Sequence, residues 1–69
     1  MTIDQLPSNA TVKIYTLSGA LVRELTASDL GVVTWDAKDA GGTFVPSGVY
    51  FGLASAGGDT KTFKIVVQR

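Results

Sequence analysis

Residues 47–68 read SGVYFGLASAGGDTKTFKIVVQ, and this stretch decides the fold. It holds two runs rich in β-branched and aromatic residues, 48–54 and 60–68, joined by Ala56-Gly57-Gly58-Asp59. A Gly-Gly pair between two such runs is a typical signal for a tight β-hairpin, which we predict here. The second run places three apolar side chains on one face: Phe63, Ile65 and Val67.

The rest of the chain shows the same two-residue period. We predict further strands over residues 11–17, 20–26 and 32–36, and a brief edge strand over residues 2–6. Val22 and Leu25 are three residues apart, which strict alternation would put on opposite faces, so we expect a bulge near Arg23. No segment has the period and capping of a helix, and the chain is therefore predicted to be all-β.

The composition limits both the size and the chemistry of this protein. A chain of 69 residues is one small domain, residues 1–69, which buries about 60% of its unfolded surface on folding. It contains no Cys and no His, which removes disulfides, Cys/His zinc sites and the Ser-His and Cys-His catalytic arrangements. Six Lys+Arg balance six Asp+Glu, so no charge excess attracts nucleic acid. No apolar run is long enough for a membrane span.

Short strands with frequent turn signals favour a small antiparallel β-sandwich of the immunoglobulin-like class. Trp35 lies in the middle of the chain and is the expected core anchor. Tyr50 opens a strand within Ser47-Gly48-Val49-Tyr50, which resembles a tyrosine corner, where the Tyr hydroxyl bonds to upstream backbone. The predicted core is Val12, Ile14, Val33, Trp35, Tyr50, Phe63 and Ile65.

Nearly the whole chain also resembles a known family of domains. The residues that carry the resemblance are, in chain order, Ala10-Thr11-Val12-Lys13-Ile14-Tyr15-Thr16-Leu17-Ser18-Gly19, Leu21-Val22-Arg23, Leu25, Trp35-Asp36, Asp39, Gly42, Ser47-Gly48-Val49-Tyr50-Phe51, Lys64-Ile65-Val66-Val67 and Arg69. This pattern resembles the FlgD Ig-like family, named for the flagellar hook-capping protein, and is similar to the C-terminal sorting domains of type IX secretion substrates.

The resemblance implies a non-catalytic structural, attachment or sorting module at the C-terminus of a larger exported bacterial protein, extracellular or on the cell surface, with its signal peptide outside this chain. It also implies an additional strand before residues 3–6, so we expect a sandwich that lacks its first strand. The alternatives are a self-assembling scaffold, like the hook-capping protein, and a carbohydrate-binding module.

Asp36 and Asp39 are the candidate metal ligands, because they lie in a Gly-rich turn and carboxylate oxygens are what Ca²⁺ prefers. Their spacing does not match an EF-hand loop. The other interpretation is that both carboxylates accept hydrogen bonds from nearby backbone N–H groups and shape the loop as Asx turns. A glycosidase-type acid pair would need a substrate cleft, for which so short a chain has little material, and we expect no enzyme activity and no cofactor.

A protein is the expected partner, either the rest of the parent chain or identical copies joined through a β-edge. The strand over residues 48–54 carries no charge on either face, and such a strand is normally covered on both sides. The residues expected to contribute to self-association are Ile3, Leu6, Phe51 and Leu53. Of Trp35, Tyr15 and Tyr50, only Tyr15 is expected to be exposed, and a single ring is a poor surface for sugars. Lys61, Lys64 and Arg69 are expected to protect the last strand against edge pairing.

Overall fold

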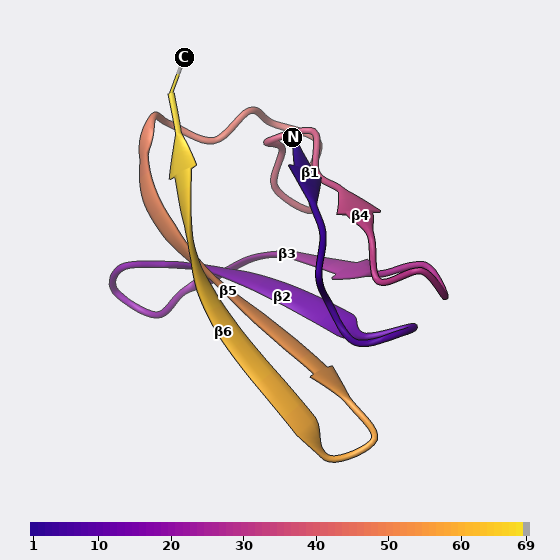
Figure 1. Ribbon diagram of the computed structural model, residues 1–69. Helices are drawn as coiled ribbons and strands as arrows, with labels where there is room; N and C mark the ends of the chain where they lie inside the picture. The colour runs from indigo at the N-terminus through magenta and orange to yellow at the C-terminus, as the bar shows by residue number, and fades with distance from the viewer. Residues whose placement is uncertain (69) are drawn as a thin grey trace.

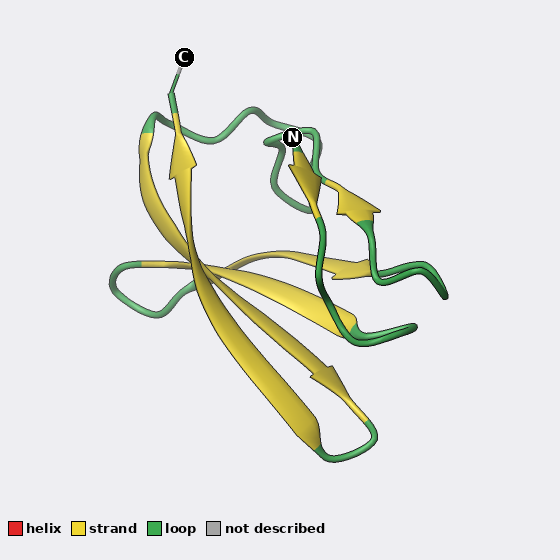
Figure 2. Ribbon diagram, in the orientation of Figure 1, coloured by secondary structure: helices red, strands yellow, loops and turns green. Residues whose placement is uncertain are grey.

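The computed structural model describes residues 1–68 and is all-β (Figures 1 and 2). The strands are β1 (Thr2–Ile3), β2 (Thr11–Thr16), β3 (Leu21–Thr26), β4 (Val33–Thr34), β5 (Gly48–Ala56) and β6 (Asp59–Val67). A four-stranded sheet has the order β3-β2-β5-β6, and a two-stranded sheet pairs β1 with β4. All the pairings are antiparallel. The small immunoglobulin-like β-sandwich predicted from the sequence is therefore confirmed.

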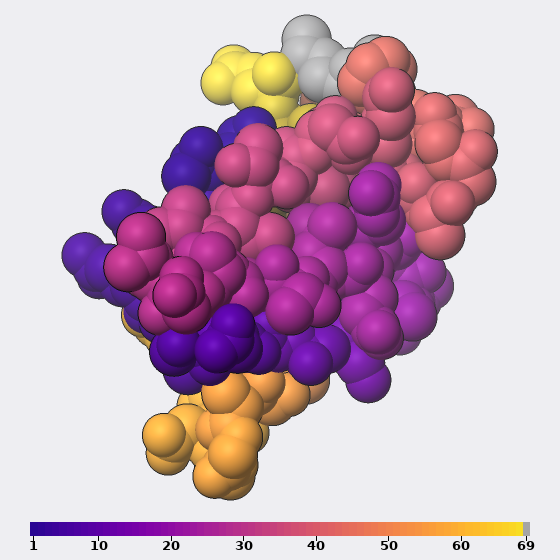
Figure 3. All heavy atoms as spheres, turned by 90° about the vertical axis from the view of Figure 1, so that its right-hand side faces the viewer, coloured from indigo at the N-terminus to yellow at the C-terminus, as the bar shows by residue number. Residues whose placement is uncertain are grey.

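The β5–β6 hairpin is the longest element of the fold. Its strands pair continuously from Gly48↔Val67 to Ala56↔Asp59. Gly57 and Gly58 have φ angles of 55° and 97°, which both central positions of a two-residue type I′ turn require. The tip of this hairpin projects beyond the rest of the molecule (Figure 3). Pairing extends to the turn itself, so β5 ends two residues later than the sequence indicated.

The predicted bulge lies in the β2–β3 hairpin. Ile14 pairs with Arg23 but Tyr15 pairs with Leu21, so Val22 is the extra residue on β3. The bulge explains the three-residue spacing of Val22 and Leu25. The extra residue shifts the alternation of inward and outward side chains by one position along β3. Leu25, opposite the buried Val12, is then packed against the core.

The two-stranded sheet is shorter than predicted. Residues 2–6 and 32–36 were expected as strands, whereas pairing is confined to Thr2↔Thr34 and Ile3↔Val33. Gln5 has a φ angle of 58°, a left-handed conformation that ends an extended strand. The chain nevertheless stays alongside β4, because the Leu6 N–H donates to the Gly31 carbonyl at 3.1 Å.

The core lies between the two sheets. Its buried hydrophobic residues are Leu6, Ala10, Val12, Ile14, Ala27, Val33, Trp35, Val45, Tyr50, Ala54, Ile65 and Val67. Two positions differ from the sequence-based expectation. Phe63, expected in the core, is only partly buried, because its ring packs against the core but lines an open groove beside β6. Leu6, expected at a self-association surface, is 8% exposed and belongs to the core cluster, since its backbone bond to Gly31 holds this segment against the sandwich.

Candidate functional site

One end of the sandwich is closed by Trp35 and Tyr50. Their rings meet edge to face with centroids 6.0 Å apart. The Tyr50 hydroxyl donates to the Pro46 carbonyl at 2.6 Å, which is the tyrosine corner predicted from the sequence. The Trp35 Nε1–H donates to the Lys38 carbonyl at 2.9 Å. Both polar ring atoms are paired and both rings are buried, so neither aromatic residue is available to stack on a sugar.

Asp36 and Asp39 lie in the loop that follows Trp35. Asp39 Oδ1 accepts the backbone N–H groups of Gly41 at 2.9 Å and Thr43 at 3.0 Å. Asp36 Oδ1 accepts the Lys38 N–H at 3.1 Å. These are the Asx-type contacts of the second interpretation. Within residues 1–68, no group of three or more His, Cys, Asp or Glu side chains is gathered as a metal ion would require.

Arg23 braces this loop, and the sequence analysis did not identify that role. Its guanidinium NH1 group lies 3.3 Å from Asp36 Oδ1 and donates to the Lys38 carbonyl at 3.1 Å. Arg23 is opposite Ile14 in the register, so the bulge places a charged residue on the side of the sheet that faces the core. The sequence signal for this role was a charged residue at a core-facing position of a strand, because such a charge needs polar partners inside the fold.

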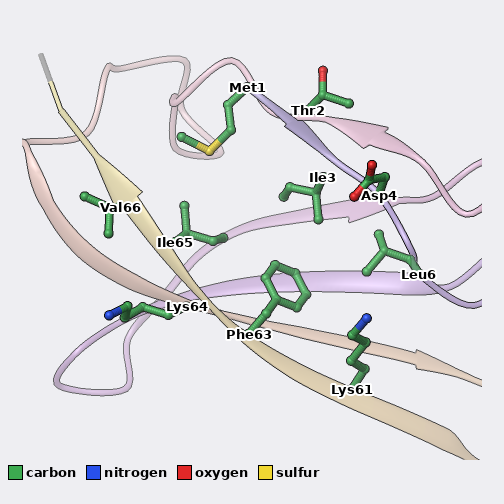
Figure 4. Close-up of a pocket in the computed structure, with 10 residues that line it drawn as sticks. All are labelled: Met1, Thr2, Ile3, Asp4, Leu6, Lys61, Phe63, Lys64, Ile65 and Val66. Carbon is green, nitrogen blue, oxygen red and sulfur yellow. The ribbon is translucent and has the colours of Figure 1, made fainter.

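An open groove lies between β1 and β6, on a different side of the core. Its volume is about 410 Å³, and it is lined by residues 1–4, Leu6, Lys61 and residues 63–66 (Figure 4). Its apolar lining residues are Met1, Ile3, Leu6, Phe63, Ile65 and Val66. In Figure 4 the Phe63 ring stands on β6 and points into the space below Ile3.

Gly52 determines where the Phe63 ring lies. The two residues are direct neighbours across β5 and β6. A Cβ atom built on Gly52 would collide with the Phe63 ring, so the ring rests on the bare backbone of β5. Glycine is therefore required at this buried position if the aromatic ring is to occupy the groove.

Charged groups lie along the groove as well. The Lys61 ammonium spans it and donates to the Gln5 carbonyl at 2.9 Å. Lys64 is exposed on β6, and Asp4 is exposed on the opposite wall. Within the described chain, neither lysine lies within 4.0 Å of a carboxylate, since Arg23 and Asp36 form the ion pair found there. The groove thus combines an apolar interior with two lysines that form no ion pair with any carboxylate of residues 1–68.

A second group of exposed apolar side chains lies on the outer face of the four-stranded sheet, beside Lys13, Glu24 and Lys64. One row across β2, β5 and β6 consists of Tyr15, Phe51 and Lys64. In the neighbouring row on the same face, Val49 pairs with Val66. Phe51 and Val66 are 45% and 56% exposed. The structure thus separates the four residues expected at a self-association surface. Phe51 and Leu53 are on this outer face, whereas Ile3 and the largely buried Leu6 line the groove.

Charged side chains are few on both surfaces among residues 1–68. Asp4 is the only carboxylate among the groove residues, and the outer-face rows of β2, β5 and β6 pair apolar side chains with lysines and threonines. Both surfaces are suited to contact with another polypeptide, since each joins exposed apolar side chains to a polar rim. Arg69, expected to take part in protecting β6, lies outside the described residues.

Comparison with solved structures gives one informative match. The chain is similar to part of PorZ, an essential bacterial surface component of the type IX secretion system of Porphyromonas gingivalis, with 31% sequence identity and a TM-score of 0.80. The match covers 99% of this chain and 9% of the PorZ chain. No protein-family model and no curated protein matches the sequence. No helix in residues 1–68 is long and apolar enough to cross a membrane.

Proposed function

We propose that this protein is a non-catalytic, secretion-related immunoglobulin-like module of a larger bacterial surface or exported protein. The observation that carries the proposal is the similarity to PorZ, which extends over 99% of this chain at a TM-score of 0.80. Because the matched segment is 9% of PorZ, the likeness is to one building block of that protein. Such a module acts through the surfaces it presents to other polypeptides.

The finer role that we propose is attachment or sorting at the C-terminus of the parent protein. The resemblance to FlgD Ig-like and type IX sorting domains supports this role. The contacts of such a domain would involve β6 and the outer face, which hold the exposed apolar residues Val66 and Phe51. The closed corner at Trp35 and Tyr50 would maintain the fold.

Fusion of residues 1–69 to the C-terminus of a secreted reporter tests the sorting role. The reporter carries its own signal peptide and is expressed in Porphyromonas gingivalis, where we expect it at the cell surface or in the medium. A matched fusion with Trp35→Ala, which removes the core anchor, should remain in the periplasm. Retention of the unaltered fusion in the periplasm would contradict sorting, and attachment would then be tested separately.

Self-assembly is the second candidate, and the exposed outer face of the four-stranded sheet favours it. Phe51 is 45% exposed and Leu53 is half-buried next to it on that face. Monomeric proteins expose such contiguous apolar surface mainly where they bind a partner. Two copies could cover it by packing these sheets face to face.

Sedimentation velocity at micromolar concentration tests self-assembly. We expect a species heavier than the 7.2 kDa monomer, shifted toward the monomer by Leu53→Lys. Leu30→Lys is the matched control, because Leu30 is 84% exposed in a loop away from the sheet, and it should leave the distribution unchanged. A single 7.2 kDa species at every concentration would rule out self-assembly.

A further inference from the structure

We propose that the groove between β1 and β6 binds an extended peptide of another protein, which adds to the edge of β6 as a further strand and alternates apolar with acidic side chains. This inference names a binding site and a partner chemistry beyond the proposed function. It rests on the backbone edge, the apolar interior and the charges of one surface, each of which restricts the ligand independently.

The unpaired backbone edge of β6 requires a ligand in the extended conformation of a β-strand. β6 is the last strand of its sheet and pairs with β5 along one side only. In an antiparallel ladder, alternate residues of an edge strand direct their N–H and C=O groups outward. The groove follows β6 from Lys61 to Val66, a length of about 17 Å at a strand rise of about 3.3 Å per residue. A peptide of about five or six residues would fit this edge.

The opposite wall keeps the position beside β6 open. Three of residues 1–6 direct their backbone hydrogen bonds toward β4 and its neighbours: Ile3 pairs with Val33, Leu6 bonds to Gly31, and Met1 bonds to Trp35. The Gln5 carbonyl is turned the other way and accepts the Lys61 side chain of β6, at one end of the groove. This segment therefore forms a wall of the groove and does not pair with β6. Its side chains Ile3 and Leu6 face Phe63 across the opening (Figure 4).

The interior of the groove selects apolar side chains at every second position. The side of β6 that faces the core carries Phe63 and Ile65, and the opposite wall adds Ile3. A strand added to β6 would point alternate side chains into this interior, because side chains alternate between the two faces of a sheet. Each apolar side chain buried there would contribute favourable transfer free energy.

Lys64 selects acidic residues at the intervening positions, and Lys61, on the same face of β6 as Phe63 and Ile65, favours an acidic residue at one end of the peptide. Lys64 is on the outer face of β6, next to where the outward side chains of an added strand would lie. Lys61 is at one end of the groove and bonds to the neutral carbonyl of Gln5. Asp4 provides one negative charge on the far wall, so the lining retains an excess of positive charge. Cross-strand pairs of opposite charge stabilise a sheet.

The same charges disfavour a second copy of this chain at the β6 edge. Pairing two β6 strands would bring Lys61 and Lys64 of each copy to one short seam, against a single carboxylate per strand, Asp59 at the hairpin tip, and like charges close together destabilise strand pairing. An acidic strand from a different protein removes this repulsion. The proposal therefore commits to a foreign peptide, and self-pairing at this edge becomes an outcome of the test.

The test uses a synthetic probe peptide, acetyl-Gly-Val-Glu-Val-Glu-Val-Gly-amide, titrated into the isotope-labelled full chain and followed by amide chemical shifts. We expect saturable shifts in residues 1–6 and 61–66. Two control peptides separate the causes. Replacing Glu by Lys should abolish the shifts, and N-methylation of alternate backbone nitrogens should weaken binding at least tenfold, because the edge hydrogen bonds are lost.

Lys64→Gln provides the test on the protein side, with Lys13→Gln on β2 as the matched neutralisation outside the groove. We expect Lys64→Gln to weaken probe binding about two- to fivefold, the range of an exposed ion pair, and Lys13→Gln to leave it unchanged. Equal binding of the Glu and Lys peptides, undiminished binding of the N-methylated peptide, or no shifts in the groove at millimolar probe would overturn the proposal. Concentration-dependent shifts at 61–66 without peptide would show instead that a second copy occupies the edge.

Discussion

The Trp35 corner and the β1–β6 groove are built from similar residues but differ in how their polar groups are satisfied. At the corner, the Trp35 Nε1–H and the Tyr50 hydroxyl each donate to a nearby carbonyl, and Arg23 braces the following loop. In the groove, an aromatic ring, aliphatic side chains and lysines surround a strand edge that pairs on one side only. The polar groups of the corner are paired within the domain, whereas the groove leaves backbone groups and lysines available to a partner.

This difference separates stability from binding within a very small domain. Without disulfides or Cys/His metal sites, the chain depends on its single core for stability. At about 0.05–0.15 kcal/mol per residue, a domain of this size has only about 3–10 kcal/mol of stability in total. Substitutions at the corner should therefore threaten folding, whereas those at the exposed rim of the groove should leave the fold intact.

Trp35→Ala is expected to have the largest effect. Trp35 is 0% exposed, and removing a large aromatic side chain from a core costs about 3–5 kcal/mol. This loss is comparable to the whole stability of the domain, so the variant should be largely unfolded at 25 °C by far-ultraviolet circular dichroism. In the unaltered protein, Trp35 fluorescence should be blue-shifted and insensitive to iodide. A native-like spectrum for the variant would show that the corner does not hold the fold together.

Gly31→Ala should have the next largest effect and tests the wall of the groove. Gly31 has a φ angle of 74°, and an added Cβ would collide with the Leu6 carbonyl oxygen. The left-handed conformation costs about 1–2 kcal/mol for an alanine, and the collision adds to it. Gly19→Ala is the matched control, since Gly19 has a φ angle of 92° but nothing lies within 4 Å of its Cβ position. Urea denaturation should show a greater loss for Gly31→Ala; equal losses would contradict a close approach of residues 1–6.

The alternation of apolar residues predicted much of this fold, because strand pairing depends on a local period of two. The β5–β6 hairpin, the bulge at β3 and the Tyr50 corner all follow from nearby residues. The extent of β1 and β4 could not be predicted, because it depends on the turn at Gln5 and on the bond from Leu6 to Gly31 across the sandwich.

The candidate site was less accessible to sequence reasoning for the same reason. Ile3 and Leu6 were expected at a self-association surface, but a groove that also needs Phe63 depends on how two distant segments face each other. The sequence signal for it was indirect: Gly52 within an apolar strand marks a close approach, here by the Phe63 ring. The roles of Phe51 and Leu53 in self-association stay predictions.

Tyr50→Phe should have a moderate effect. It tests how much the hydrogen bond of the Tyr50 hydroxyl contributes to the stability of the corner. The substitution removes the hydroxyl that donates to Pro46 but keeps the ring against Trp35. A hydrogen bond of this kind contributes about 0.5–1.5 kcal/mol, so the free energy of unfolding should fall by about that amount. Tyr15→Phe, on the outer face of β2, should change stability by less than about 0.5 kcal/mol. Equal effects of the two variants would remove the distinction between a corner hydroxyl and a surface one.

Calcium is expected to have the smallest effect. Its addition tests whether the carboxylates of the loop after Trp35 are already satisfied within the domain, like the polar groups of the corner. Asp39 Oδ1 already accepts two backbone N–H groups, and Asp36 Oδ1 accepts one and contacts Arg23. An ion would have to compete with these donors and with the nearby guanidinium. A gain of 1 kcal/mol shifts the Tm of so small a domain by about 4–8 °C, so even weak binding would be visible. We expect millimolar Ca²⁺ or EDTA to move the Tm by less than about 1 °C, because no binding free energy is gained. A rise of several degrees in Ca²⁺ that Asp39→Asn abolishes would instead make this loop a ligand site, and the corner would then depend on an ion.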